Sequence, residues 1–236
     1  GFHVVKELVA KNIPVILVLT GTDLYRDIIS TKTSKKEHCL RSIQLASAIV
    51  VLHKNAVSDL LKVISVPRHR IFVVLQSVVD FKKRSFFFKK KNQYKILLLS
   101  NIRKEKGIIV AISGFLEFQK NIDARTKFTL DHIGGVLDQD YFKKITNLSE
   151  GVKSVSFLGS IEKEKLQTIL ASYDLLLHSS FIEGGSLVIQ EAHNAGLPII
   201  ASDISCHTAL LGSAYVGLHS VGSAIDVSEK LHTFFF

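Results

Sequence analysis

The chain has 236 residues, 47% of them hydrophobic, and its formal net charge is +9. This length allows one large domain or two small ones, each with a buried core. No apolar run comes near the ~20 residues of a membrane span, so the apolar runs are predicted to be buried strands. The two cysteines, Cys39 and Cys206, lie far apart in sequence and fit a reduced cytoplasmic protein better than a disulfide framework.

The two ends of the sequence indicate a fragment. The chain contains no methionine, and its first residues have the spacing of a helix interior rather than of a signal peptide. It finishes on Phe234, Phe235 and Phe236, which we expect to form an exposed terminus. We therefore expect sequence to be missing at the front, and at the back as well.

The basic charge would suit phosphate, nucleic acid or an anionic membrane, although lysine-rich codon usage explains it equally well. The largest basic run, at 82–84 and 89–91, brackets three phenylalanines and is predicted to be a solvated linker. No recognisable nucleic-acid module surrounds this run. We therefore expect no nucleic-acid partner, and peripheral membrane contact stays open.

Short apolar runs alternate with amphipathic helical stretches along the chain. The first part predicts, in chain order, a strand at 13–20, a helix at 34–45, a strand at 49–52, a helix at 55–64 and a strand at 71–75. The second part predicts strands at 94–100, 127–133, 154–158, 175–178 and 198–201, alternating with helices at 106–119, 139–148, 163–172 and 186–194. This alternation indicates parallel sheets of βαβ units, and hence an α/β fold.

A break in the pattern near residues 77–93 divides the chain in two. We predict Rossmann-like domains at 1–80 and 94–236, joined by a basic linker at 81–93 and facing a cleft. Ligands of open parallel sheets bind in the loops that follow the carboxyl ends of the strands. Functional residues are therefore expected in those loops.

The densest motif is FIEGGSLVIQEAHNAGLPIIAS, at 181–202, which follows a predicted strand and opens a helix. Gly184, Gly185 and Ser186 would stand at the helix N-terminus, where free N–H groups and the helix dipole attract phosphate. Glu191 follows Glu183 by about two helical turns, and a carboxylate can accept two hydrogen bonds from a sugar diol. A capped helix with an exposed Glu191 is the simpler alternative.

This motif resembles the E-x7-E signature of family 4 retaining glycosyltransferases, which have the two-domain GT-B fold, and the downstream Gly-x-Pro agrees with it. The resemblance implies that Glu183 lies beside the transferred sugar and acts in catalysis. It also implies that Glu191 holds the donor ribose and that the amides at 184–186 meet the diphosphate. Residues 1–80 would then be the end of an acceptor-side domain, and 94–236 the nucleotide-sugar-binding domain.

The second motif, SNIRKEKG at 100–107, closes a predicted strand and opens a helix. The family usually has Gly-Arg, two variable residues and Glu-Lys-Gly here, and its Arg and Lys bind the donor phosphates. Lys106 matches that Lys and is assigned to catalysis, whereas Asn101 replaces the Arg and Arg103 is the candidate substitute. The alternative for Lys106 is a solvated lysine, although a cation is disfavoured at a helix N-terminus unless an anion binds there.

Two glycine loops add donor-binding candidates. Gly134 and Gly135 end a predicted strand, and Asp138 is expected to cap the next helix. FLGSI, at 157–161, resembles the family loop whose backbone touches the nucleotide base, which adds Gly159 and Ser160. A glycine after a strand is more often an ordinary turn.

The motif TGTDLYRD, at 20–27, follows a buried strand in the first domain. Many family members have His-Gly-Ser/Thr-Asp there, with the His near the donor sugar, but this chain has Thr in place of that His. No histidine role therefore follows from the resemblance. The candidates for acceptor contacts are Thr20, Gly21, Asp23, Tyr25 and Arg26, although Asp23 could instead cap a helix.

The resemblance implies a hexosyl-type glycosyltransferase that moves a sugar from a UDP-sugar to an acceptor and retains the anomeric configuration. It implies no metal and no cofactor, because the nucleotide sugar is a co-substrate. TGTDLYRD together with EGG resembles the subgroup that contains the selenosugar synthases of selenoneine biosynthesis. Selenophosphate is then a candidate acceptor.

Two other functional classes stay open. A nucleotide-sugar epimerase of the same architecture would need acid and base residues that we do not find, and would act without an acceptor. A non-catalytic nucleotide- or nucleic-acid-binding module is suggested by the charge, and would bind polynucleotide with a steep salt dependence. None of the ten histidines has H-E-x-x-H spacing, so no metal site is predicted.

Overall fold

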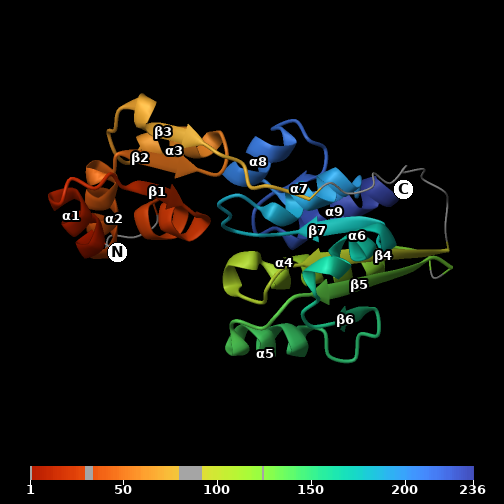
Figure 1. Cartoon of the computed structure of the whole chain (residues 1–236). Coiled ribbons are helices and arrows are strands. Elements are labelled where there is room, and N and C mark those ends of the chain that lie inside the picture. The colour runs from red at the N-terminus through yellow and green to blue at the C-terminus, as the bar shows by residue number, and fades with distance from the viewer. Residues whose placement is uncertain (1, 30–33, 80–91, 124) are drawn as a thin grey trace. The chain divides into compact units, whose positions relative to one another are not determined.

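The computed structural model describes residues 2–29, 34–79, 92–123 and 125–236, which form two compact units (Figure 1). One unit comprises Gly1–Ser77, Ile182–Ser186 and Ser205–Ser213, and the other Val78–Phe181, Leu187–Ile204 and Ala214–Phe236. Each unit has its own parallel sheet, which confirms the α/β class. The expected linker lies outside the described residues except for 92 and 93, and the predicted domain boundaries stay a prediction.

The first unit is built on a three-stranded sheet of order β1-β2-β3. Its elements are α1 (Phe2–Ala10), β1 (Ile16–Leu19), η1 (Thr22–Ile29), α2 (Ser34–Leu45), β2 (Ala48–Val51), α3 (Asn55–Leu61), η2 (Arg68–Arg70) and β3 (Ile71–Val73). Alternate side chains of a strand point to the same face, so Ile49 and Ile71, which are paired in register, share one face. Together with Leu24 and Ile28 of the π-helix η1 they form the buried core of this unit.

The second unit is built on a six-stranded sheet of order β6-β5-β4-β7-β8-β9. Its strands are β4 (Gln93–Leu99), β5 (Lys127–Ile133), β6 (Val155–Phe157), β7 (Leu175–His178), β8 (Ile199–Ser202) and β9 (Leu218–His219). Its helices are η3 (Lys104–Lys106), α4 (Ile108–Lys120), α5 (Gln139–Leu148), η4 (Lys163–Lys165), α6 (Leu166–Ser172), α7 (Leu187–Ala195) and α9 (Ala224–Phe235), and α8 (Ser205–Leu211) belongs to the first unit.

The main core of the second unit lies on one face of this sheet. Ile96, Leu130 and Leu177, from three neighbouring strands, pack there on side chains of α4, α5 and α9. The end of α9 belongs to this core, because Phe235 is only 9% exposed and its ring lies 4.8 Å from that of Tyr94. The expected exposed terminus is therefore wrong for Phe235, whereas Phe236 is 75% exposed.

The order of the strands positions the functional site. From β4 the chain proceeds through β5 and β6 to one edge of the sheet, and from β7 through β8 and β9 to the other. The strand order therefore reverses between the neighbours β4 and β7, and ligands of doubly wound sheets bind at the carboxyl ends beside such a switch point. Within the described ranges, no helix has both the length and the apolar character that crossing a membrane requires.

The expected cap of α5 is confirmed. The side chain of Asp138 accepts a hydrogen bond of 2.9 Å from the backbone N–H of Tyr141, which would otherwise lack a partner at the helix start. We predict that Asp138→Ala lowers the free energy of unfolding by about 0.5–2 kcal/mol, the usual value of such a cap. Urea unfolding should show a smaller loss for Asp140→Ala, which removes a first-turn charge and keeps the cap. Equal losses would contradict the capping role.

Candidate functional site

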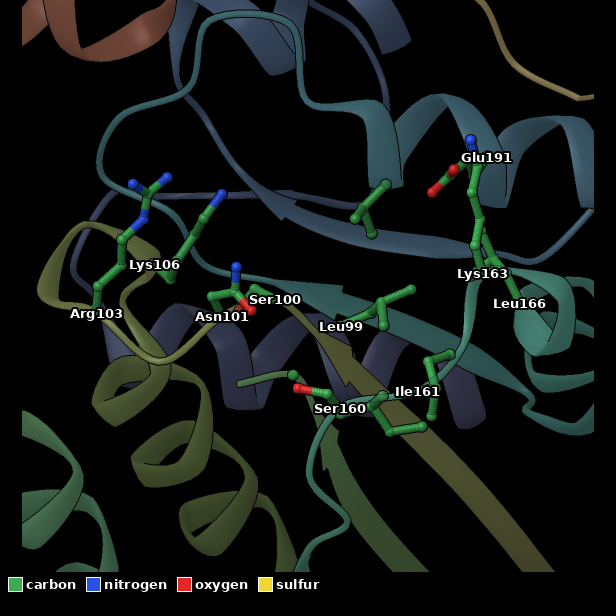
Figure 2. A pocket seen from close by; sticks show the side chains of 13 residues that line it. Leu99, Ser100, Asn101, Arg103, Lys106, Ser160, Ile161, Lys163, Leu166 and Glu191 are labelled. Carbon is green, nitrogen blue, oxygen red and sulfur yellow. The ribbon is translucent and has the colours of Figure 1, made fainter. Parts of the chain in front are cut away.

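A pocket of about 430 Å³ opens at the carboxyl ends of β4 and β5, entirely within the second unit (Figure 2). It is lined by Leu99, Ser100, Asn101, Arg103, Lys106, Ile133, Gly134, Ser160, Ile161, Lys163, Leu166, Val188 and Glu191. Six of these residues are donor-site candidates from the sequence: Asn101, Arg103, Lys106, Gly134, Ser160 and Glu191. The pocket therefore gathers residues from four connections that are far apart in the chain.

The carboxylate of Glu191 forms one end of this pocket. Glu191 and Val188 stand three positions apart on α7, which places both on the face that lines the pocket. Glu191 is only 7% exposed, so the simpler expectation of an exposed side chain is wrong. Among the described residues, no hydrogen-bond donor or ion-pair partner meets this carboxylate. Burial raises the pKa of Glu191, and the ammonium of Lys163 opposes that rise.

Two cations occupy the other end of the pocket, as Figure 2 shows. Arg103 has an extended backbone, and its buried Nε meets no hydrogen-bond partner among the described residues. Lys106 ends η3, and Gly107 after it has a φ of +60°. A side chain at Gly107 would place its Cβ 1.9 Å from the carbonyl oxygen of Ser179, so only glycine permits this turn. The turn fixes Lys106 immediately before α4.

The residue that replaces the family arginine has a structural role. The Oδ1 atom of Asn101 accepts a hydrogen bond of 3.0 Å from the backbone N–H of Gly135, which ties the loop after β4 to the loop after β5. The loop after β6 joins them, because the N–H of Gly134 donates to the carbonyl of Gly159 over 2.9 Å. Gly135 and Gly159 thus hold the floor of the site together without lining the pocket themselves.

The apolar wall of the pocket and one of its cations were not predicted from the sequence. Leu99, Ile161, Leu166 and Val188 supply apolar surface between its two ends. The missed cation is Lys163, in the first turn after the FLGSI loop. Its position directly after a predicted ligand loop was a usable signal, but a lysine in a charged helix is usually a solvated one.

The remaining donor-site candidates lie in the first unit. Glu183, Gly184, Gly185 and Ser186 belong to its segment Ile182–Ser186. There the backbone of Gly184 touches that of Gly21, and a Cβ at Gly184 would lie 2.2 Å from the nitrogen of Gly21. This contact brings Glu183 close to the TGTDLYRD loop and explains why glycine is needed at both positions.

Backbone strain marks the end of the same segment. Ser186 has a φ of +37°, a left-handed conformation that a residue with a side chain rarely adopts, and it is 6% exposed. Such strained residues cluster at ligand sites.

Three acceptor-side candidates have partners within the first unit. Asp23 Oδ2 accepts hydrogen bonds from the N–H and the hydroxyl of Thr20, at 3.0 and 2.6 Å. These donors precede the helix, so the bonds close a turn and do not cap η1. The exposed Arg26 pairs with Asp27 over 2.9 Å. Thr20, Asp23 and Arg26 are thus engaged with neighbouring side chains.

Tyr25 is part of a buried network. Its hydroxyl lies 2.9 Å from His53 Nε2 and donates to Asp59 Oδ2 over 3.0 Å. Because His53 Nδ1 accepts from the N–H of Ala56, the neutral ring carries its proton on Nε2 and donates it to Tyr25. Burial lowers the pKa of His53 and raises that of Tyr25. This network favours a structural role for Tyr25.

Comparisons with known proteins agree with the fold. Residues 79–234 match the family model "Glycosyl transferases group 1". The "Glycosyltransferase 1 domain-containing protein 1" of Xenopus tropicalis is 22% identical over 241 residues, which cover 96% of this chain and 68% of the relative. The "N-acetyl-alpha-D-glucosaminyl L-malate synthase" of Bacillus anthracis is 23% identical over 244 residues, covering 97% and 60%.

Solved structures confirm the predicted GT-B fold. Anabaena Alr3699/HepE in complex with UDP and glucose superimposes with a TM-score of 0.75 at 16% identity, covering 97% of this chain and 64% of that one. The chain thus spans just under two thirds of that structure's length.

Proposed function

The chain belongs to the glycosyl transferases group 1 family, and from this premise we propose that its pocket binds a nucleotide-diphosphate sugar, whose sugar the protein transfers to an acceptor. The observation that carries the proposal is the buried carboxylate of Glu191, which opens into the pocket and meets no protein donor among the described residues. Because this side chain lines the open pocket, a bound ligand can supply the hydrogen-bond donors. A ribose diol supplies two of them.

The rest of the pocket suits the same ligand. Arg103 and Lys106, opposite Glu191, can neutralise a diphosphate, and the apolar side chains between the two ends suit a nucleoside. Loss of a nucleoside diphosphate from the anomeric carbon leaves charge on its phosphates, and fixed cations stabilise that charge in the transition state. The described pocket therefore supports positioning and charge stabilisation as the catalytic contribution.

We also propose finer assignments. A UDP-sugar is favoured because the Anabaena relative of similar fold was crystallised with UDP and glucose. Retention, membership of family 4 and selenophosphate as the acceptor rest on E-x7-E, TGTDLYRD and EGG. We further propose that the protein is cytoplasmic and works without a metal or cofactor, with Lys106 and Arg103 meeting the phosphates.

The function is tested by incubating the purified protein with UDP-, GDP- and ADP-sugars, each with and without a panel of acceptors that includes selenophosphate. We expect nucleoside diphosphate to be released only when an acceptor is present. Turnover of the sugar without an acceptor would favour an epimerase instead. If the protein binds none of the nucleotides in the panel, the assignment of the pocket is contradicted.

Glu191→Ala tests the ribose contact directly. We expect UDP binding to weaken by about 1.5–3 kcal/mol, the usual contribution of a hydrogen bond to a charged group, as measured by titration calorimetry. Glu164→Ala is the matched control, because Glu164 lies on the neighbouring η4 and does not line the pocket. Unchanged UDP affinity in a folded Glu191→Ala variant would contradict the assignment.

A further inference from the structure

The pocket holds a third cation at the same end as Glu191. The side chain of Lys163 reaches the Glu191 end of the pocket from η4, as Figure 2 shows. The two charges interact electrostatically, yet among the described residues they form no ion pair within 4.0 Å. A carboxylate and an ammonium thus line the same pocket without a direct ion pair between them.

The surroundings make this cation important for Glu191. The elements that pack most extensively on α7 are α6 and β8, whose described residues carry no ionisable side chain. Arg103 and Lys106 line the opposite end of the pocket. A nearly buried carboxylate without an opposite charge tends to take up a proton, and a protonated carboxyl group accepts fewer hydrogen bonds than a carboxylate.

We propose that Lys163 is a positioning residue for the ribose, because its ammonium keeps Glu191 charged and facing the diol. The inference rests on the proposed function and adds a residue to it. Lys163 would act through Glu191 without contacting the diphosphate, in contrast to Arg103 and Lys106. It would therefore control how strongly the pocket prefers ribose to deoxyribose. It would also set the pH below which this preference is lost.

The test compares Lys163→Met with wild type in the purified protein, using calorimetry with UDP and 2′-deoxy-UDP between pH 5 and 8. Burial already raises the pKa of Glu191, and removal of Lys163 raises it further. A raised pKa means that Glu191 becomes protonated at a higher pH as the solution is acidified. We expect UDP affinity to fall in the variant as the pH is lowered, by at most about tenfold for each unit by which the pKa of Glu191 rises.

Two further features of the result are specific to this role. The preference for UDP over 2′-deoxy-UDP should be smaller in Lys163→Met than in wild type. As the pH is lowered, the variant should also begin to lose this preference at a higher pH than wild type does. Lys163→Arg should restore both. Lys165→Met is the matched control, because Lys165 lies on the same η4, pairs with Glu162 over 2.9 Å and does not line the pocket.

The possible outcomes separate this inference from the proposed function. If wild-type protein binds UDP and prefers it to 2′-deoxy-UDP, but Lys163→Met shows the same preference and pH profile, Lys163 has no such role and the proposed function stands. If Lys163→Met weakens both nucleotides equally at every pH, the lysine acts on the phosphates or the fold, and the inference is overturned. If wild-type protein does not bind UDP, both proposals fail.

Discussion

Replacing Lys106 with alanine is expected to lower the rate of sugar transfer about 10²–10³-fold, by analogy with the loss of a single oxyanion-stabilising donor. Lys106 ends η3 and lines the pocket beside Arg103, in a turn that Gly107 fixes against Ser179. Its ammonium would stabilise the negative charge that develops on the diphosphate as this group leaves. The same variant should weaken UDP binding far more than uridine binding, because uridine lacks the phosphates.

Transfer kinetics and calorimetry with the two ligands provide the measurements. Lys104→Ala is the control, because Lys104 belongs to the same η3 turn but does not line the pocket. If Arg103 has taken over from the missing family arginine, Arg103→Ala should show the same dependence on the phosphates. Equal losses for UDP and uridine would mean that Lys106 acts through the fold.

Much of the second unit could be predicted because its signals are local. The helix at 139–148 and the strands at 127–133 and 175–178 have the predicted bounds. The strand at 175–178 is a nearly continuous apolar run, which is typical of strands buried in a parallel sheet, whereas the strand at 127–133 alternates polar and apolar residues. The loops that follow them could be assigned to ligand binding because parallel strands bring their carboxyl ends to one edge.

The elements that were missed lacked a clear local signal or had a misleading one. Ala224–Phe235 forms α9 behind a Ser223 cap, which accepts from Asp226 over 3.1 Å. Its final phenylalanines were interpreted as a free terminus, although Phe235 packs into the aromatic core with Phe128. The π-helix η1 could not be predicted from residue preferences, because they do not distinguish its hydrogen bonding from that of an α-helix.

The site residues that belong to a sequence motif could be predicted. Those that tertiary packing brings to the site could not. Asn101 replaces an expected arginine, and only the structure shows that its carboxamide binds the backbone of Gly135. Lys163 interacts electrostatically with Glu191, which lies 28 positions later in the chain. Neither relation is visible in the sequence, because sequence spacing says nothing about contacts between separate βα connections.

Glu183→Gln is expected to lower transfer about 10²–10³-fold, the range found when one group that stabilises a transition state is lost. The E-x7-E motif assigns Glu183 to the transferred sugar, and Glu183 is 9% exposed in a segment that the Gly184–Gly21 contact fixes. The substitution keeps the size of the side chain and removes its charge. UDP binding should stay nearly intact, because interactions made mainly in the transition state appear in the rate.

Three measurements make this prediction specific to Glu183. Calorimetry with UDP should separate Glu183→Gln, which keeps affinity, from Glu191→Ala, which loses it. Thermal unfolding should show that the variant is folded, since Glu183 is buried and has other contacts. NMR of the product should show the anomeric configuration of the donor. Transfer at the wild-type rate, or a product of inverted configuration, would show that Glu183 does not have the role that E-x7-E implies; the segment would then be a tight glycine turn before α7.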